Sequence, residues 1–521
     1  MFYNLIRNLL LLPLIAVLSL TLYAQEKIDT AVMSQIKHEE FSHSEIPQIA
    51  QQLFDEFGPR LTNSPGFHRA ADWVITQLKG FGIQQTALEP WGEFGRGWEL
   101  QNFCMSLAKP YYQPIIAQPL AWTHSVGPVT APVISVLVDE NVETFLTSHG
   151  SQIKGKFILL NDSVSLPSPF IPSASRYTNN DLATLQDTYM HSEEDVIDLF
   201  AYQKKKAALL STMQKTGAIC ILERQQTIGG DGIITISDAP GKYNYKIGYV
   251  PSIPEIVIST EDFNKLTRMA KNQEPVEVSL NCQTAFFDKD LQGYNVIAEI
   301  PGSDPLLKDQ VVMIGAHLDS WPGGDGATDN GAGCVVMMEV MRIFKQLNLH
   351  SKRTIRIALW SGEEQGSLGS YNYVKNHFGD QATMKMLPAQ SRISVYYNLD
   401  NGSGKIRGIW AQNNAGAKSI FEEWIVPYKD LGATTVSLHN TGSTDHEPFD
   451  AIGIPAFQFI QDPLEYETRT HHTNMDVFDH LFIDDLKQAA VVVAGFVYNS
   501  ANRPELLPRK NLPPAARYPF E

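Results

Sequence analysis

Cysteine is scarce in this chain, and positive charge is in the minority. The four cysteines, Cys104, Cys220, Cys282 and Cys334, are widely spread over 521 residues and form no CxxC pair. This spacing argues against a thiolate zinc site or a redox dithiol, while a disulfide and buried free thiols both stay open. The 57 acidic and 41 basic residues give a net charge of −16. That balance argues against nucleic acid as a partner, because nucleic-acid binding needs a basic surface.

Long apolar runs are missing too, except at the N-terminus. The run Leu9–Tyr23 follows a single basic residue, Arg7, and ends at the small residue Ala24. This pattern predicts a secretory signal peptide over residues 1–24, and therefore an exported protein, secreted or periplasmic. An uncleaved anchor is the alternative, because the run approaches spanning length. Since Pro13 interrupts the run, we favour cleavage and expect no stable membrane insertion afterwards.

The rest of the chain is apolar enough, at 43%, to bury real cores. We divide it into the first part of the main domain, an inserted domain, the remaining α/β part of the main domain and a proline-rich tail on the surface: residues 25–118, 119–283, 284–502 and 503–521. In the insert, short β-rich runs alternate with polar loops, and residues 163–195 are interpreted as one long loop.

In the main domain, apolar strands alternate with amphipathic segments. The expected helices cover residues 333–347, 368–378, 417–431 and 483–500, with a further one before Gly80 and another over 202–216 in the insert. Strands that alternate with helices predict an α/β fold whose central sheet is mostly parallel or mixed and is covered by helices on both faces.

Metal-binding and proton-transferring side chains follow four of the predicted strands. They are His317 and Asp319, Glu363 and Glu364, Asp400, and, in a loop after the fourth strand, His471 and His472. Open α/β sheets bind ligands at the carboxyl ends of their strands, so we expect these groups to meet at one edge. Asp329 joins them from a glycine-rich loop before a helix, where glycines let the backbone approach closely.

Imidazole combined with carboxylate is typical of zinc sites. Three carboxylates and one hydroxide would balance the charge of two zinc ions, so the cluster could be buried as a neutral unit. Taken alone, each residue has an ordinary explanation: Asp329 as a helix cap, the glutamate pair as a turn, the loop histidines as surface residues. Their coincidence at strand ends is what indicates a functional site with two Zn²⁺ ions.

The motifs GAHLDS, DNGAG, SGEEQGSLGS, NLD and HHT, in this order within residues 315–476, resemble the two-zinc exopeptidases of metallopeptidase family 28. That family includes leucyl aminopeptidases, glutamate carboxypeptidase and carboxypeptidase Q. The upstream GPRLTNSPG and the layout of the chain are most similar to the carboxypeptidase Q branch. More weakly, GKFILLND and KTGAICIL resemble a protease-associated domain in the insert.

The resemblance implies a complete ligand set. His317 and Asp400 would hold one zinc ion, Glu364 and His472 would hold the other, and Asp329 would bridge both. His472 is preferred over His471 because the family's ligand directly precedes Thr or Ser. The peptide bond after the bridging aspartate is expected to be cis.

The resemblance also implies three residues that act beside the metals. Glu363 would be the general base, and Asp319 would orient the His317 ring, as ligating histidines usually require. His446, in the segment STDHEPF, could donate a hydrogen bond to the oxyanion, although a packed or surface histidine is an equal alternative.

The expected function is an exported zinc exopeptidase that cuts short peptides or dipeptides. A carboxypeptidase needs a cation for the substrate carboxylate, with Arg469, Arg407 and Arg392 as candidates, whereas an aminopeptidase needs an acceptor for the free amine. A non-catalytic binding protein and a one-zinc glutaminyl cyclase are disfavoured, because the full ligand set is present. The sequence leaves side-chain preference, the role of the insert and a possible homodimer open.

Overall fold

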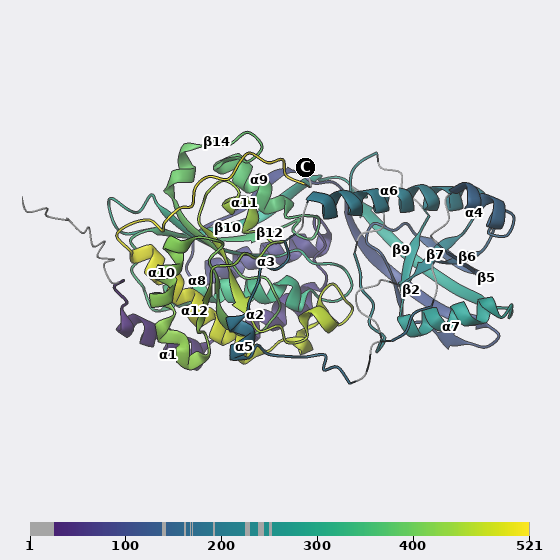
Figure 1. Ribbon diagram of the computed structural model, residues 1–521, viewed down its shortest axis with the longest axis horizontal. Coiled ribbons are helices and arrows are strands. Elements are labelled where there is room, and N and C mark those ends of the chain that lie inside the picture. The colour runs from purple at the N-terminus through teal and green to yellow at the C-terminus, as the bar shows by residue number, and fades with distance from the viewer. Residues whose placement is uncertain are drawn as a thin grey trace, which may run out of the picture.

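The computed structural model describes residues 26–137, 142–160, 163–166, 168, 170–190, 193–224, 230–237, 244–248 and 253–519. The predicted signal peptide, residues 1–24, lies outside this part of the chain. The described chain forms two lobes along its long axis, one built around a sheet covered by helices and one around a second sheet (Figure 1). Within the described ranges, no helix has the length and hydrophobicity that crossing a bilayer requires.

The main lobe contains an eight-stranded mixed sheet. In spatial order its strands are β1 (Gln85–Glu93), β10 (Gln292–Ile300), β12 (Thr354–Trp360), β11 (Val311–His317), β15 (Ile393–Asn398), β18 (Ala456–Gln461), β16 (Ile406–Trp410) and β17 (Thr435–Ser437). The central strands β12, β11, β15 and β18 run parallel, while β1, β10 and β16 pair antiparallel with their neighbours. The carboxyl ends of the parallel strands therefore meet at one edge.

Helices cover both faces of this sheet, as the sequence predicts. One face lies under α1 (Thr30–His43), α2 (Ile46–Gln51), α3 (Pro65–Gly80), α8 (Ala332–Gln346), α10 (Ala415–Trp424) and α12 (Ile483–Asn502). The other face lies under α9 (Leu368–His377) and α11 (Glu447–Asp450). A hairpin of β13 (Gly379–Asp380) and β14 (Lys385–Met386) follows α9.

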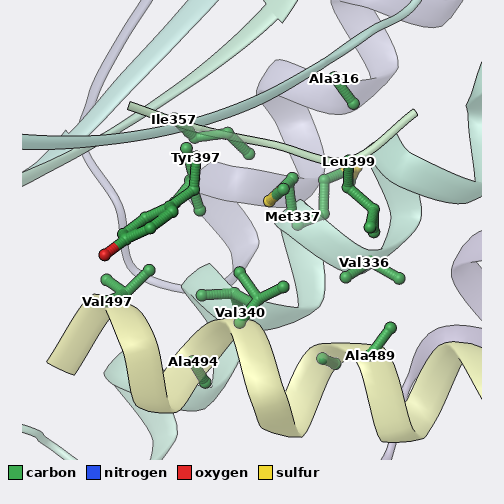
Figure 2. Close-up of a cluster of buried hydrophobic side chains, with 14 of the residues drawn as sticks. Ala316, Val336, Met337, Val340, Ile357, Tyr397, Leu399, Ala489, Ala494 and Val497 are labelled. Atoms are coloured by element: carbon green, nitrogen blue, oxygen red, sulfur yellow. The ribbon is translucent and has the colours of Figure 1, made fainter. Parts of the chain in front are cut away.

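Alternation along β12 explains the two layers. Ile355, Ile357 and Leu359 point into the larger core, and Ala358 and Trp360 point into the core under α9, because successive side chains of a strand face opposite sides. Figure 2 shows α12 and α8 meeting the sheet through small and branched side chains, so that both helices pack close to the strands: Ala489, Ala494, Val497, Val336, Val340 and Ile357.

The second lobe contains another eight-stranded sheet. Its strands, in spatial order, are β3 (Gln113–Pro114), β2 (Gly97–Lys109), β9 (Glu277–Phe287), β5 (Val126–Val136), β6 (Phe157–Leu160), β7 (Cys220–Glu223), β8 (Glu255–Ile258) and β4 (Ala117–Pro119). Its helices are α4 (Val142–His149), α6 (Glu193–Thr216) and α7 (Thr260–Lys271). Because the long strands β2 and β9 pair from Gly97 and Phe287 onward, this sheet extends beyond the predicted insert, residues 119–283, at both ends.

Two predicted elements differ in extent. The helix expected over 417–431 ends at Trp424 and continues as a 3-10 turn, Val426–Leu431, because Pro427 supplies no N–H and disfavours helical geometry at the residue before it. The expected loop 163–195 contains the short helix α5 (Asn179–Ala183). Leu182 of α5 packs against Trp410 and Ile460 of the main sheet, so this loop leaves its own lobe and crosses the other.

The proline-rich tail is anchored more firmly than a surface segment needs to be. Leu507 is 2% exposed, and its N–H donates to the Ser394 hydroxyl. The Arg509 guanidinium donates to three backbone carbonyls of the main lobe.

Of the two possibilities left open for the cysteines, the structure has free thiols at all four positions.

Candidate metal centre

The predicted site residues of three central strands lie together at their carboxyl ends. His317 is the last residue of β11, Glu363 and Glu364 follow β12, and Asp400 follows β15. These strands are parallel neighbours, so their ends lie side by side. The sheet therefore delivers a histidine and three carboxylates to one place from segments far apart in the sequence.

Asp329 lies at the centre of the cluster. Its Oδ1 is 3.2 Å from His317 Nε2, and its Oδ2 is 3.1 Å from His472 Nε2. It belongs to a turn, Ala327–Gly331, directly before α8, and the Asp329–Asn330 peptide bond is cis, as the resemblance predicts. One carboxylate thus faces two imidazoles through different oxygens, which is the arrangement that a bridging ligand requires.

Each imidazole has a second carboxylate beside it. His317 Nε2 is 3.5 Å from Asp400 Oδ1, and His472 Nε2 is 2.9 Å from Glu364 Oε2. His317, Asp329 and Asp400 form one group of donors close enough to hold an ion. A second group contains Asp329, His472 and the neighbouring His471, with Glu364 in contact with His472. The five predicted ligands therefore lie in two groups that share Asp329.

Unpaired buried atoms show that these donors fit a cation. His317 Nε2, Asp329 Oδ2 and Glu364 Oε1 are buried and have no hydrogen-bond partner, which costs free energy unless something else satisfies them. Burial alone lowers the pKa of His317, but the Asp400 and Glu363 carboxylates raise this pKa well above its usual value. The carboxylates thus favour positive charge at the point where divalent ions would supply it.

Asp319 holds the site differently from the prediction. His317 Nδ1 donates to the backbone carbonyl of Asp319 over 2.9 Å, while the carboxylate Oδ1 is 3.7 Å away. The buried carboxylate instead accepts hydrogen bonds from the Thr62 hydroxyl (2.8 Å) and from the N–H groups of Glu363 (3.3 Å) and Glu364 (3.4 Å). The residue therefore orients the ring through its main chain and the two glutamates through its side chain.

Two further residues support the ligands and were not predicted. The Thr444 hydroxyl donates to Asp400 Oδ2 over 2.6 Å. Asp476 accepts from the N–H groups of Thr328 (2.5 Å) and Asp329 (3.3 Å), and burial followed by the nearby Asp329 charge raises its pKa to about 7. Thr444 belongs to the segment STDHEPF, and Asp476 ends the span 315–476 that contains the resembling motifs. Their positions in the sequence therefore pointed to the site without giving their roles.

Glu363 lies against the cluster without belonging to either group of donors. Its Oε2 is 3.9 Å from His317 Nε2, and its Oε1 accepts a hydrogen bond from the Ser367 hydroxyl over 3.2 Å. Burial raises the pKa of Glu363 well above its usual value. A carboxyl group with a raised pKa beside a metal site is suited to take up a proton.

A cavity of about 240 Å³ opens onto the cluster. It is lined by Tyr189, Asp329, Glu363, Glu364, Asp400, Asn401, Gly442, Ser443, Thr444, Tyr466, Glu467, His471 and His472. Tyr189 comes from the crossing loop of the second lobe, and its hydroxyl donates to Glu467 Oε1 over 2.6 Å. This contribution could not be predicted from the sequence, because residues 163–195 have neither a motif nor a regular hydrophobic period.

The two remaining histidines differ in position. His471 lines the cavity, and its Nε2 is 3.7 Å from Asp329 Oδ2, farther than that of His472. His446 is buried outside the cavity lining, with Nε2 2.9 Å from the Thr441 carbonyl and in contact with Gln412. Of the two alternatives for His446, the geometry therefore matches the packed histidine and not the oxyanion donor.

The three arginines considered for a substrate carboxylate lie away from the cavity. Arg469 faces Asp231 (3.5 Å) and Glu465 (3.6 Å). Arg407 pairs with Asp462 over 2.8 Å, and Arg392 is exposed on a 3-10 turn. Among the described residues that line the cavity, there is no lysine or arginine.

Comparison with known proteins finds peptidases among the relatives of this chain. Residues 295–497 match the family model for peptidase family M28. Carboxypeptidase Q of Homo sapiens is 27% identical over 88% of this chain and 85% of its own length. Aminopeptidase YwaD of Bacillus subtilis is 28% identical over 59% of this chain and 61% of its own length. The crystal structure of a peptidase M28 precursor from Shewanella amazonensis, 25% identical, superposes with a TM-score of 0.67 over 93% of this chain and 98% of its own. Residues 295–497 therefore carry a peptidase family M28 domain.

Proposed function

We propose that the protein is an exported exopeptidase that uses two zinc ions to hydrolyse short peptides or dipeptides from one end. The observation that carries the proposal is the position of Asp329, whose two oxygens lie 3.2 and 3.1 Å from two different imidazoles. His317 and Asp400 would hold one ion, His472 and Glu364 the other, and Asp329 both. When bound, zinc supplies Lewis acidity, which activates water and polarises a carbonyl.

Glu363 carries the proton in this proposal. It lines the cavity beside the ligands, accepts the proton of the attacking water as the peptide carbonyl is attacked, and returns that proton to the leaving amine. The raised pKa favours this role, because a base works best when its pKa lies near the working pH. Asp319 keeps the backbone of Glu363 in place while the side chain exchanges its proton.

The cavity favours recognition of a free amine over a free carboxylate. Its described lining has no cationic side chain but contains Glu467, in addition to the acidic residues of the cluster. Glu467 Oε1 is fixed by the Tyr189 hydroxyl, and a fixed carboxylate is the natural acceptor for an ammonium group. Of the two exopeptidase activities, carboxypeptidase and aminopeptidase, the cavity lining therefore favours the aminopeptidase.

End-blocked peptides test the proposal. Purified full-length protein is incubated with a dipeptide or tripeptide in free, N-acetylated and C-amidated form, with chelator and then with zinc restored. We expect cleavage of the free and amidated peptides, loss of cleavage on acetylation, and dependence on zinc at two ions per chain by metal analysis. Cleavage that survives chelation, or that requires the free carboxylate, would contradict the metal or the end assignment respectively.

A substitution at Glu467 tests whether the protein recognises the free amino end of its peptide substrate. Glu467→Gln removes a charge from the amine-binding side, and because hydrogen bonds to charged groups contribute roughly 1.5–3 kcal/mol, kcat/KM should fall about 10- to 100-fold for peptides with a free amine. Glu422→Gln, an exposed glutamate on α10, is the matched control and should leave kcat/KM unchanged. Equal rates in both variants would remove Glu467 from substrate recognition.

A further inference from the structure

The C-terminal tail reaches the loop that carries Glu363. Near its end the tail is fixed by two hydrogen bonds with Gln381: the Ala516 N–H donates to the Gln381 carbonyl (3.2 Å), and the Gln381 side-chain amide donates to the Ala516 carbonyl (3.3 Å). Two residues later, Tyr518 is only 8% exposed. In Figure 1 the C-terminus lies beside α9, the helix that begins just after the glutamate loop. The tail therefore ends against the catalytic side of the main lobe.

Tyr518 makes three contacts there. Its ring stacks on Tyr371 of α9, with centroids 4.0 Å apart and planes at 9°. Its hydroxyl donates to the Gly366 carbonyl over 2.6 Å and also contacts the Ser367 side chain. A stacked ring and a directed hydroxyl together fix one orientation of the side chain, which is more than burial of a tail residue requires.

Ser367 connects this contact to the proposed base. The Ser367 hydroxyl donates to Glu363 Oε1 over 3.2 Å. The N–H groups of Gly366 and Ser367 both donate to the Glu363 carbonyl, at 2.7 and 2.8 Å. The turn that presents the Glu363 carboxylate is thus held at its backbone by the same two residues that Tyr518 contacts.

The conformation of Ser367 requires such support. Its φ of +47° lies in the left-handed region, which is sparsely populated by residues other than glycine and is retained only where the surroundings determine it. The Gly366 carbonyl that Tyr518 holds belongs to the peptide unit directly before this strained residue. Contact with the tail therefore bears on the backbone conformation from which the serine hydroxyl reaches Glu363.

We propose that Tyr518 is a positioning residue for Glu363 and acts through Ser367. Neither Tyr518 nor Ser367 lines the cavity, so neither is placed to touch the substrate. The inference rests on the proposed function, because it assigns a purpose to the orientation of the Glu363 carboxylate. It gives the last residues of the chain a part in turnover rather than in folding alone.

The test uses the zinc-loaded full-length protein with Tyr518→Phe, Ser367→Ala and the double variant. Tyr518→Phe keeps the stacked ring and removes the hydroxyl. Because small misplacements of a catalytic group cost up to about 100-fold, we expect kcat to fall about tenfold while KM, zinc content and the thermal midpoint stay unchanged. Tyr112→Phe, at an exposed tyrosine of the second lobe, is the control and should match the wild type.

The double variant separates positioning from general stability. If Tyr518 acts through Ser367, the double variant is no slower than Ser367→Ala alone, because effects of coupled residues do not add. Multiplicative losses, an unchanged kcat in Tyr518→Phe, or a kcat loss matched by a lower thermal midpoint would each overturn the inference. Glu363→Gln is measured beside them: turnover that survives this substitution overturns the base assignment itself, independently of Tyr518.

Discussion

Two groups of buried carboxylates lie near α8, and they handle their charge in different ways. At the start of the helix, Asp329, Glu364 and Asp400 surround two histidines and face a cavity of about 240 Å³. Near its middle, Glu339 lies with Glu39 and Glu40 of α1 around one arginine, Arg342. A buried charge must be compensated by an opposite charge, a proton or hydrogen bonds. The two groups use different kinds of compensation, and only one of them leaves room for a metal ion.

In the arginine group, the compensating charge comes from the protein itself. The Arg342 guanidinium donates to both Glu339 oxygens (2.9 and 2.7 Å) and to Glu39 (2.8 Å). The third carboxyl, Glu40, is fully buried, and burial together with the adjacent Glu339 raises its pKa to about 9, so a proton neutralises it. A guanidinium and a proton thus compensate the charge of one group, although both Glu40 oxygens also lack a hydrogen-bond partner. In the other group the unpaired atoms lie beside a cavity that an ion can enter.

The largest difference between the two groups should appear when one glutamate in each is replaced by glutamine. Glu363→Gln should lower kcat by about 10²–10⁴-fold, the usual contribution of general acid–base catalysis, and should retain both metal ions, because Glu363 belongs to neither ligand group. Steady-state kinetics and metal analysis measure the two effects. Glu40→Gln is the matched control and should leave kcat unchanged; loss of metal from the Glu363 variant would make this residue a ligand.

The arginine group breaks when its cation is removed. Arg342→Met leaves Glu39 and Glu339 buried without a partner, and breaking a buried pair in this way costs about 3–5 kcal/mol. We expect a lower thermal midpoint with normal zinc content and normal kcat in the protein that remains folded. A thermal midpoint equal to that of the wild type would contradict this prediction. It would show that water reaches the carboxylates around Arg342, so that they are not buried charges.

The smallest effect concerns pH. Glu40 loses its proton near pH 4.5 in the unfolded chain but near pH 9 in the folded one. Between these values only the folded chain holds the proton, so this site's contribution to stability falls as pH rises through the window. Glu40→Gln should abolish that loss and stabilise the protein by about 1–3 kcal/mol at mildly alkaline pH.

Thermal midpoints of wild type and Glu40→Gln, measured from pH 5 to pH 9, check this prediction. The groups that act on Glu40 are Glu339, Ser44 and Arg342. Glu39 shares Arg342 and pairs with His43 over 3.2 Å. Glu422→Gln on α10 serves as the control for an exposed glutamate. Parallel curves for wild type and the Glu40 variant would mean that Glu40 is ionised in the folded protein.

The sequence was sufficient to predict which candidate ligands lie together, because the order and direction of the strands bring them to one edge of the sheet. His317 and Asp400 end strands of one parallel sheet, and strand ends of such a sheet meet. The mixed sheet and the helices on both faces followed from the same alternation of apolar runs. Asp319 contacts the His317 ring as expected, but the atom that makes the contact did not follow, because a motif does not specify whether the carbonyl or the carboxylate is used.

What the sequence missed comes from segments without periodicity. Tyr189 reaches the cavity on a loop of the second lobe, and Tyr518 reaches the glutamate loop on the tail. Both depend on how a long irregular segment crosses another part of the molecule, which is decided by many tertiary contacts and not by local propensity. The second sheet extends beyond residues 119–283 for a related reason: β2 and β9 are long enough to serve as its stem.

That stem has a consequence for protein engineering. The second lobe leaves and re-enters the main one through paired strands, with Trp98 opposite Phe286, so its excision needs only a short splice. Yet the N–H of Ile236 in the excised part donates to the His472 carbonyl over 2.7 Å. A shortened enzyme made by this splice would keep every predicted ligand in its sequence but lose this backbone tether of His472 and the neighbouring bonds between Ile234 and Asn474. A graft of a foreign lobe must therefore replace these contacts.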